Sequence, residues 1–138
     1  MKTIKQISIF IENRRGSMSR ILGALSNQDI EIFAASVADT NDYGILRLIT
    51  SNQIKASQLL SEAGLLVNMN EVLAVSVDGS VESFANAIAS LTRNGVIINY
   101  LYTFSKDSKL VLILRPADLE TACKVAEEQG LELIKGWE

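Results

Sequence analysis

The sequence predicts an α+β fold made of two similar units, each with the element order β-α-β-β-α-β and an antiparallel sheet. Three observations lead to this prediction. Apolar residues of the first half alternate as in strands or recur as in helices, in that order. The second half of the 138-residue chain repeats the first, and no run of Gly, Pro or Ser separates them. We therefore expect two domains, residues 1–70 and residues 71–138.

The first half begins with a strand and a helix. A strand is expected over residues 5–12, because Ile7, Ile9 and Ile11 would share one face. From Met18 onward, apolar residues follow the i, i+3, i+4, i+7 spacing of an amphipathic helix, which predicts a helix over residues 17–27. Strands are expected over residues 30–38 and 45–50, on either side of a turn cluster at residues 40–44.

A second helix and a fourth strand complete the unit. Asn52 is a suitable N-cap for this helix, and Gly64 is a suitable stop. The fourth strand is expected over residues 65–68, and residues 68–71 are expected to connect it to a fifth strand over residues 72–77. The resulting order is that of the ferredoxin-like unit.

The internal repeat is visible without gaps. A shift of the numbering by 66 superimposes apolar residues, caps and stops of the two halves: Leu25 on Leu91, Leu46 on Leu112, Asn52 on Asp118, and Gly64 on Gly130. Because caps and stops coincide as well as apolar positions, the sequence predicts a second unit of the same fold.

Composition excludes several classes of function. The net charge is −3 and Lys and Arg form no run, so nucleic acid is not an expected partner. No apolar stretch is long enough to span a membrane, and the first residues do not have the pattern of a signal peptide. We therefore expect a cytoplasmic protein without a membrane partner.

The chain is poor in catalytic side chains. It has no His, and its single Cys can form no intrachain disulfide and no cysteine cluster for zinc. Cys123 lies on the apolar side of an expected helix, which favours a buried thiol over a nucleophile. No pair of carboxylates has the spacing of acid and base partners. We expect no cofactor, no metal and no catalytic activity.

The segment of residues 11–18 is the strongest candidate for a binding site. It joins the first strand to the first helix, and Gly16 allows a ligand to approach the backbone closely. The N–H groups at the start of the helix favour a carboxylate or a phosphate. The alternative is an ordinary strand-to-helix turn in which Gly is merely tolerated.

Two segments carry a family resemblance. A β-α-β-β-α-β unit with Glu12-Asn13-Arg14-Arg15-Gly16-Ser17-Met18 at its first turn, and with Asp42-Tyr43-Gly44-Ile45-Leu46-Arg47-Leu48 entering its third strand, resembles an ACT domain. The resemblance covers nearly the whole chain as a tandem pair. It implies a regulatory protein that senses a free amino acid, bound between paired units against the first turn of one and the second strand of the other. A homodimer and a regulated partner protein are also implied.

The resemblance assigns the site residues. It places Asn13, Arg14, Arg15, Gly16, Ser17 and Met18 in the first-turn wall of the site. It suggests Glu31 as a polar contact from a paired unit, although a solvated strand charge is the alternative interpretation. Asn99 and Leu101, in the second repeat, are expected in the facing wall. Gly79 and Glu82 replace Asn13 and Gly16 there, so one site per chain is expected.

Three classes of function remain open. An amino-acid sensor fits the turn, the repeat and the scarcity of catalytic residues. A ligand-free module for protein interaction or oligomerisation fits the same fold. An acylphosphatase-like hydrolase is the third, because acylphosphatases share the β-α-β-β-α-β unit and use an Arg and an Asn. Arg14 or Arg15, with a strand Asn, would have to serve in that role.

Overall fold

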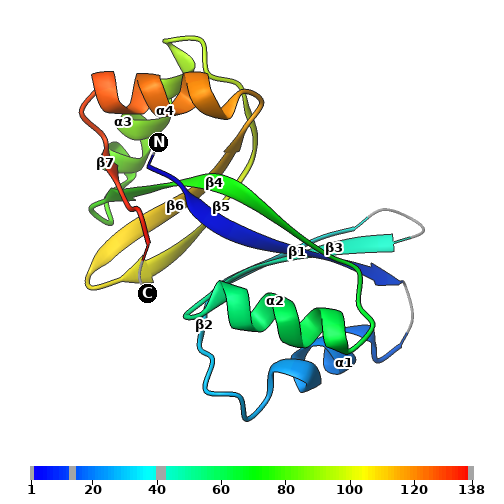
Figure 1. Cartoon of the computed structure of the whole chain (residues 1–138). Coiled ribbons are helices and arrows are strands. Elements are labelled where there is room, and N and C mark those ends of the chain that lie inside the picture. The colour runs from blue at the N-terminus through cyan, green and yellow to red at the C-terminus, as the bar shows by residue number, and fades with distance from the viewer. Residues whose placement is uncertain (1, 13–14, 40–42, 137–138) are drawn as a thin grey trace. The chain divides into compact units, whose positions relative to one another are not determined.

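A computed structural model describes residues 2–12, 15–39 and 43–136 (Figure 1). The chain divides into two compact units: Lys5–Asn70, and the segment from Glu71 onward together with the first residues through Ile4. Each unit is a βαββαβ arrangement with an antiparallel sheet, so the predicted fold class is confirmed.

The first unit contains two helices on one face of its sheet (Figure 1). Its elements are β1 (Ile4–Glu12), α1 (Ser17–Leu25), β2 (Ile32–Asp39), β3 (Tyr43–Thr50), α2 (Gln53–Glu62) and the start of β4 (Val67–Val77). The strand order is β2-β3-β1-β4. Isoleucines of β1 and leucines of β3 form a core with Ile21 of α1 and Leu60 of α2, which identifies the helix-covered face of the sheet.

The second unit repeats this plan with the rest of β4, α3 (Val81–Thr92), β5 (Ile98–Lys106), β6 (Lys109–Pro116), α4 (Leu119–Glu128) and β7 (Glu132–Leu133). Its strand order is β5-β6-β4-β7. The bounds of β6 and α4 are those of β3 and α2 shifted by the expected 66 residues. A register irregularity between Ile32 and Ala34 in β2 recurs between Ile98 and Tyr100 in β5. The internal repeat is thus confirmed in its details.

The predicted caps are confirmed. The Asn52 side chain accepts a hydrogen bond from the backbone N–H of Lys55 at 3.0 Å, and the Asp118 side chain does the same for Thr121 at 3.2 Å. Gly64 and Gly130 follow α2 and α4 with φ values of 82° and 71°, in the left-handed region that favours glycine.

Several predicted boundaries were wrong: among them, β2 begins at Ile32 and not at residue 30, and β3 begins at Tyr43 and not at residue 45. Residues 68–71 are not a connection, because β4 runs unbroken through them. Their polar side chains find partners near or in β1: Gln6 Nε2 donates to Asn70 Oδ1 at 3.2 Å, and Thr3 Oγ1 donates to Glu71 Oε1 at 3.1 Å. Helix α1 ends at Leu25 instead of residue 27, where Asn27 has already taken a left-handed φ of 60°.

Candidate functional site

The turn between β1 and α1 starts the helix at Gly16. Gly16 has φ 86°, a left-handed conformation that other residues adopt with strain. Its carbonyl accepts the first helical hydrogen bond, from Arg20 N at 2.9 Å, and Ser17 Oγ donates to the Glu12 carbonyl at 2.9 Å. Because Gly16 has no side chain, it cannot cap the helix as Asn52 caps α2, and the N-terminal end of α1 is accessible from the pocket described next.

Strand register places a gap beside this turn. On the helix-covered face, residues of β1, β3 and β2 form three successive rows: Ile7–Leu48–Ala35, Ile9–Leu46–Val37, and Ile11–Gly44–Asp39. The first two rows have a leucine at the centre, whereas the third has Gly44. A missing side chain in the middle of a row leaves space above the sheet.

A pocket of about 330 Å³ occupies this place, and its volume is at the lower end of the range for small-molecule sites. Residues from three strands and one helix start line it: Ile11, Glu12, Gly16, Ser17, Met18, Ser19, Val37, Asp39, Tyr43 and Gly44. The pocket therefore combines a helix N-terminus, apolar side chains and two carboxylates within the first unit.

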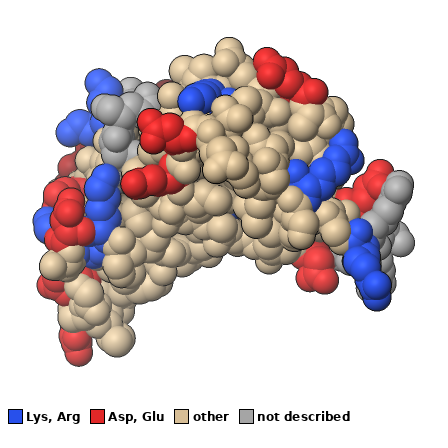
Figure 2. Space-filling view, turned by 90° about the horizontal axis from the view of Figure 1, so that it is seen from below, with Lys and Arg blue, Asp and Glu red and all other residues tan. Residues whose placement is uncertain are grey.

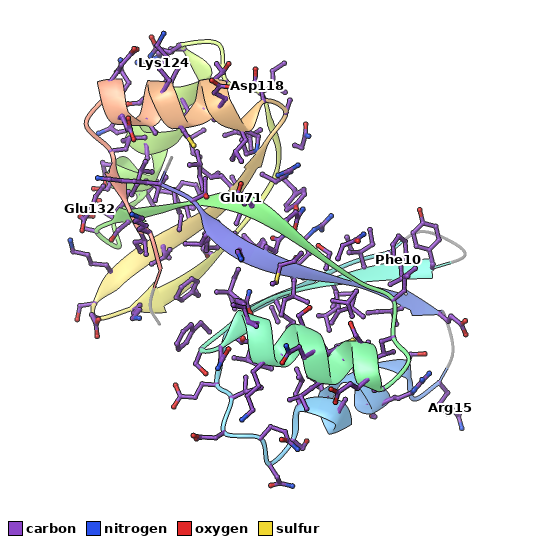
Figure 3. All side chains as sticks on the ribbon, in the orientation of Figure 1. Phe10, Arg15, Glu71, Asp118, Lys124 and Glu132 are labelled. Atoms are coloured by element: carbon purple, nitrogen blue, oxygen red, sulfur yellow. The ribbon has the colours of Figure 1, made fainter. Side chains whose placement is uncertain are left out.

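The two acids of the pocket differ in their position. Asp39 pairs with Gly44 in the third row and so belongs to the helix-covered face. Glu12 pairs with Tyr43, one residue further along, which puts its side chain on the opposite face. Tyr43 is near Phe10, with ring centroids 5.6 Å apart, and Phe10 is labelled in Figure 3.

A second pocket of about 230 Å³ lies on the other side of the turn and shares Ile11, Glu12 and Ser17 with the first. Arg20 lines it, but its Nη2 donates to the carbonyl of Ala63 at 2.9 Å, at the end of α2. A guanidinium at a helix C-terminus stabilises the helix, so Arg20 has a structural role.

The second unit lacks this gap. The row that corresponds to Ile11–Gly44–Asp39 is Val77–Leu110–Ser105, and Val77 and Leu110 pack against the core of this unit. Leucine fills the place of Gly44, and serine replaces the acid.

The start of α3 is also different. Ser80 caps it, with Oγ accepting from Ser83 N at 3.1 Å, and Asp78 Oδ1 accepts from Ser80 N at 2.8 Å. Hydrogen bonds from Ser80, and then from Ser83, lower the pKa of Asp78 to about 2. Glu82 lies within the first turn of α3, whereas Asp78 accepts a hydrogen bond from the backbone N–H of the N-cap residue Ser80.

The residues predicted for the first-turn wall are partly brought together. Gly16, Ser17 and Met18 line the pocket. Arg15 is exposed at the turn and points outward in Figure 3. Asn13 and Arg14 lie outside the described residues. Their contacts with a ligand stay predictions.

None of the residues predicted for the facing wall is among those that line the pocket of the first unit. The backbone N–H of Glu31 donates to Ser51 Oγ and the Glu31 carbonyl accepts from the backbone N–H of Ser51, next to the end of β2 opposite to Asp39. Asn99 is exposed at the irregularity of β5, and Leu101 packs against the core of the second unit. That these three residues contact a ligand stays a prediction.

Sequence reasoning missed Val37, Asp39 and Gly44 as site residues. The internal repeat contained a usable signal, because its numbering shift sets Gly44 against Leu110 and Asp39 against Ser105. Where the two halves are aligned, a glycine of the first corresponds to a core leucine of the second, and a nearby acid corresponds to a serine. Such a pair of differences indicates a position at which the first unit is less tightly packed than the second.

The rest of the described chain offers little for catalysis. Cys123 is buried, and burial raises the pKa of its thiol, which confirms the predicted core position. Among residues 2–12, 15–39 and 43–136, no three His, Cys, Asp or Glu side chains are grouped to hold a metal ion, and no helix is long and apolar enough to cross a membrane. On the face drawn in Figure 2, basic side chains are interspersed with acidic ones.

Comparison with known proteins identifies the fold. Protein BT0572 from Bacteroides thetaiotaomicron has a similar structure, with a TM-score of 0.91 and 29% sequence identity over 99% of this chain and 94% of that one. The regulatory subunit of aspartate kinase from Thermus thermophilus, in a ligand-free form, has a TM-score of 0.61 and 14% identity over 91% of this chain and 92% of that one. The corresponding subunit from Thermus flavus has a TM-score of 0.58 and 16% identity over 90% of each chain.

The identities to the aspartate kinase subunits are low, so these two similarities show the fold alone. No curated protein matches the chain. A family model described as an ACT domain pair matches residues 2–137, which confirms the resemblance of the two turn segments. The chain therefore belongs to the ACT domain family.

Proposed function

We propose that this protein is a sensor that binds one free L-amino acid per chain, in the pocket of the first unit. The observation that carries the proposal is the gap at Gly44, which opens a pocket of about 330 Å³ against the start of α1. The corresponding row of the second unit is filled by Leu110, which is why we propose one site and not two.

The chemistry of the pocket suits an amino acid. The α-carboxylate would accept hydrogen bonds from the first amides of α1, at Ser17, Met18 and Ser19, where the helix dipole favours negative charge. In the second unit, Asp78 already supplies a carboxylate at the equivalent helix start. Asn13 is proposed as a further polar anchor on the sequence prediction.

The sensor would act without turnover of its own. The two aspartate kinase neighbours are regulatory subunits, and the chain has no His and a buried Cys123. We propose that it works in the cytoplasm as a homodimer and passes the signal to a partner protein. Glu31, Asn99 and Leu101 would complete the site from a paired unit.

A thermal-shift screen of the twenty common L-amino acids, followed by isothermal titration of the best ones, tests the proposal. We expect a stoichiometry of one per chain and a loss of binding in Gly16→Glu, which adds an acid beside the proposed carboxylate position. Glu82→Ala is the matched control and should bind normally. Normal binding by Gly16→Glu with loss in Glu82→Ala would move the site to the second unit.

A ligand-free oligomerisation module is the second candidate. The observation in its favour is that β2 is an edge strand of the first unit and leaves two apolar side chains exposed, Ile32 at 44% and Val37 at 57%. Apolar strands at a sheet edge invite pairing with another chain. A protein that no amino acid stabilises but that sediments as a stable dimer would favour this function. Rapid acyl-phosphate hydrolysis, lost in Arg15→Ala, would favour an enzyme instead.

A further inference from the structure

We infer that Asp39 recognises the ammonium group of the bound molecule, and that the pocket selects α-amino acids with an uncharged, apolar side chain. The inference rests on the proposed function and names the class of ligand for the same pocket. It also assigns a specificity role to a residue of β2 that lies outside the β1–α1 turn.

The position of Asp39 is unusual for a residue that only solubilises a strand end. Ala35 and Val37 precede it on the same face of β2, and both pair with core leucines of β3. Asp39 continues this apolar series with a charge, at the row where Gly44 leaves the gap. Its carboxylate forms no ion pair or hydrogen bond with another described residue, and it lines the pocket.

Asp39 is also the better placed of the two acids. Glu12 also lines the pocket, but the strand register puts its side chain on the opposite sheet face, and its carbonyl is the acceptor for Ser17 Oγ. An ammonium in the pocket, near the helix-covered face, would therefore meet the Asp39 carboxylate. Hydrogen bonds between two charged groups are among the stronger ones in proteins.

The remaining walls determine the side chain of the ligand. Ile11, Met18 and Val37 present apolar surface to the pocket, and Val37 is 57% exposed. An apolar ligand side chain would cover this surface, whereas an acidic ligand side chain would find no basic side chain among the residues that line the pocket. A ligand with an acidic side chain would in addition be repelled by Asp39.

The second unit supplies an internal comparison. Ser105 stands at the position of Asp39, and Leu110 stands at that of Gly44. The acid is present where the gap is present, and both are replaced together. A charged residue can also protect an edge strand from pairing with another chain. If that were the only role of Asp39, an acid would be expected at the same position of β5 as well, because β2 and β5 are both edge strands of their units.

The test compares two amino acids with the 2-hydroxy acids of the same carbon skeleton. L-leucine, L-phenylalanine and their hydroxy acids are titrated into the wild type and Asp39→Asn. Glu62→Gln, which changes an exposed acid at the end of α2, is the control. We expect Asp39→Asn to weaken binding of the better amino acid at least about tenfold, about 1.4 kcal/mol. Asp39→Asn should change the dissociation constant of the hydroxy acid by less than about twofold. Glu62→Gln should change the dissociation constants of the amino acid and of the hydroxy acid by less than about twofold.

The outcomes separate this inference from the proposed function. Equal weakening of amino acid and hydroxy acid by Asp39→Asn, or no weakening, overturns the role of Asp39 while the sensor stands. Tighter binding of L-lysine or L-glutamate overturns the ligand class. If no amino acid binds the wild type, the proposed function itself has failed. Where a hydroxy acid binds too weakly for direct titration, its affinity for both proteins is measured by displacement of the amino acid.

Discussion

Replacement of Gly44 tests whether the gap in the third row is the binding pocket. A Cβ at this position would lie 3.3 Å from the Ala38 carbonyl oxygen and 3.9 Å from the Cβ atoms of Asp39 and Ile11. One contact is tight and two are ordinary. Gly→Ala also reduces the entropy of the unfolded chain, which stabilises by about 0.4–1 kcal/mol. The two effects oppose each other, so we expect the free energy of unfolding of Gly44→Ala to stay within about 1 kcal/mol of wild type.

Ligand affinity should respond far more than stability. The added methyl group occupies space between Ile11 and Asp39 that an amino acid would use. Overpacking of this kind costs roughly 1–3 kcal/mol, which corresponds to about fivefold to somewhat more than a hundredfold in the dissociation constant. Gly44→Leu, which copies Leu110 of the second unit, should abolish measurable binding.

Isothermal titration with the amino acid that most stabilises the wild type, together with thermal denaturation, measures both effects. Gly23→Ala is the matched control, because a Cβ at Gly23 would meet nothing within 4 Å and Gly23 lies in the last part of α1, away from the pocket. It should stabilise the helix by about 1 kcal/mol and leave binding intact. A folded Gly44→Leu protein with wild-type affinity would refute the assignment of the pocket.

Three further predictions concern stability. The side chain of Gln53 is buried; its Oε1 accepts hydrogen bonds from Thr50 N and Oγ1, and its Nε2 donates to two backbone carbonyls. Gln53→Ala should therefore lower the free energy of unfolding, measured in urea, by about 2–4 kcal/mol. A loss below about 0.5 kcal/mol would contradict the importance of this network. Asn52→Ala should cost about 1 kcal/mol because it removes the cap of α2, whereas Asn52→Asp should keep the cap. The pKa of Asp78 is lowered from 3.8 to about 2 in the folded protein, so its contribution to the free energy of unfolding is complete above pH about 4 and is lost as pH falls toward 2. Over that range the melting temperature of the wild type should fall more steeply than that of Asp78→Asn. Parallel plots of melting temperature against pH would contradict this prediction.

Local signals in the sequence were sufficient for most of the fold. Asn52 and Gly64 act through bonds within four residues of themselves, so their effect can be predicted without knowledge of the rest of the chain. Residues 68–71 are the opposite case. Their polarity suggested a connection, but side chains of residues more than sixty positions away, Thr3 and Gln6, satisfy two of them. A pattern read along the chain cannot report such partners.

The same distinction explains what was found of the candidate site. Gly16, Ser17 and Met18 are consecutive, and the turn from strand to helix was enough to select them. Asp39 and Gly44 become part of a site only through the register of three strands. That register was not predicted, although the repeat would have allowed an indirect inference from Leu110 and Ser105.

The two units show how a duplicated fold can keep its stability while one copy retains a cavity. Leu110 fills the second unit at the row where the first has Gly44, and Asp78 with Ser80 satisfies the helix start that Gly16 leaves accessible. Both differences fill the second unit at these places, where the first unit has room for an apolar group and for a hydrogen-bond acceptor. A ligand that supplies both would stabilise the first unit by mass action, by about 2.7 kcal/mol at a concentration one hundred times the dissociation constant. In the proposed sensor, this gain in stability on binding is therefore the source of the signal, because a first unit packed like the second would have no pocket for an amino acid.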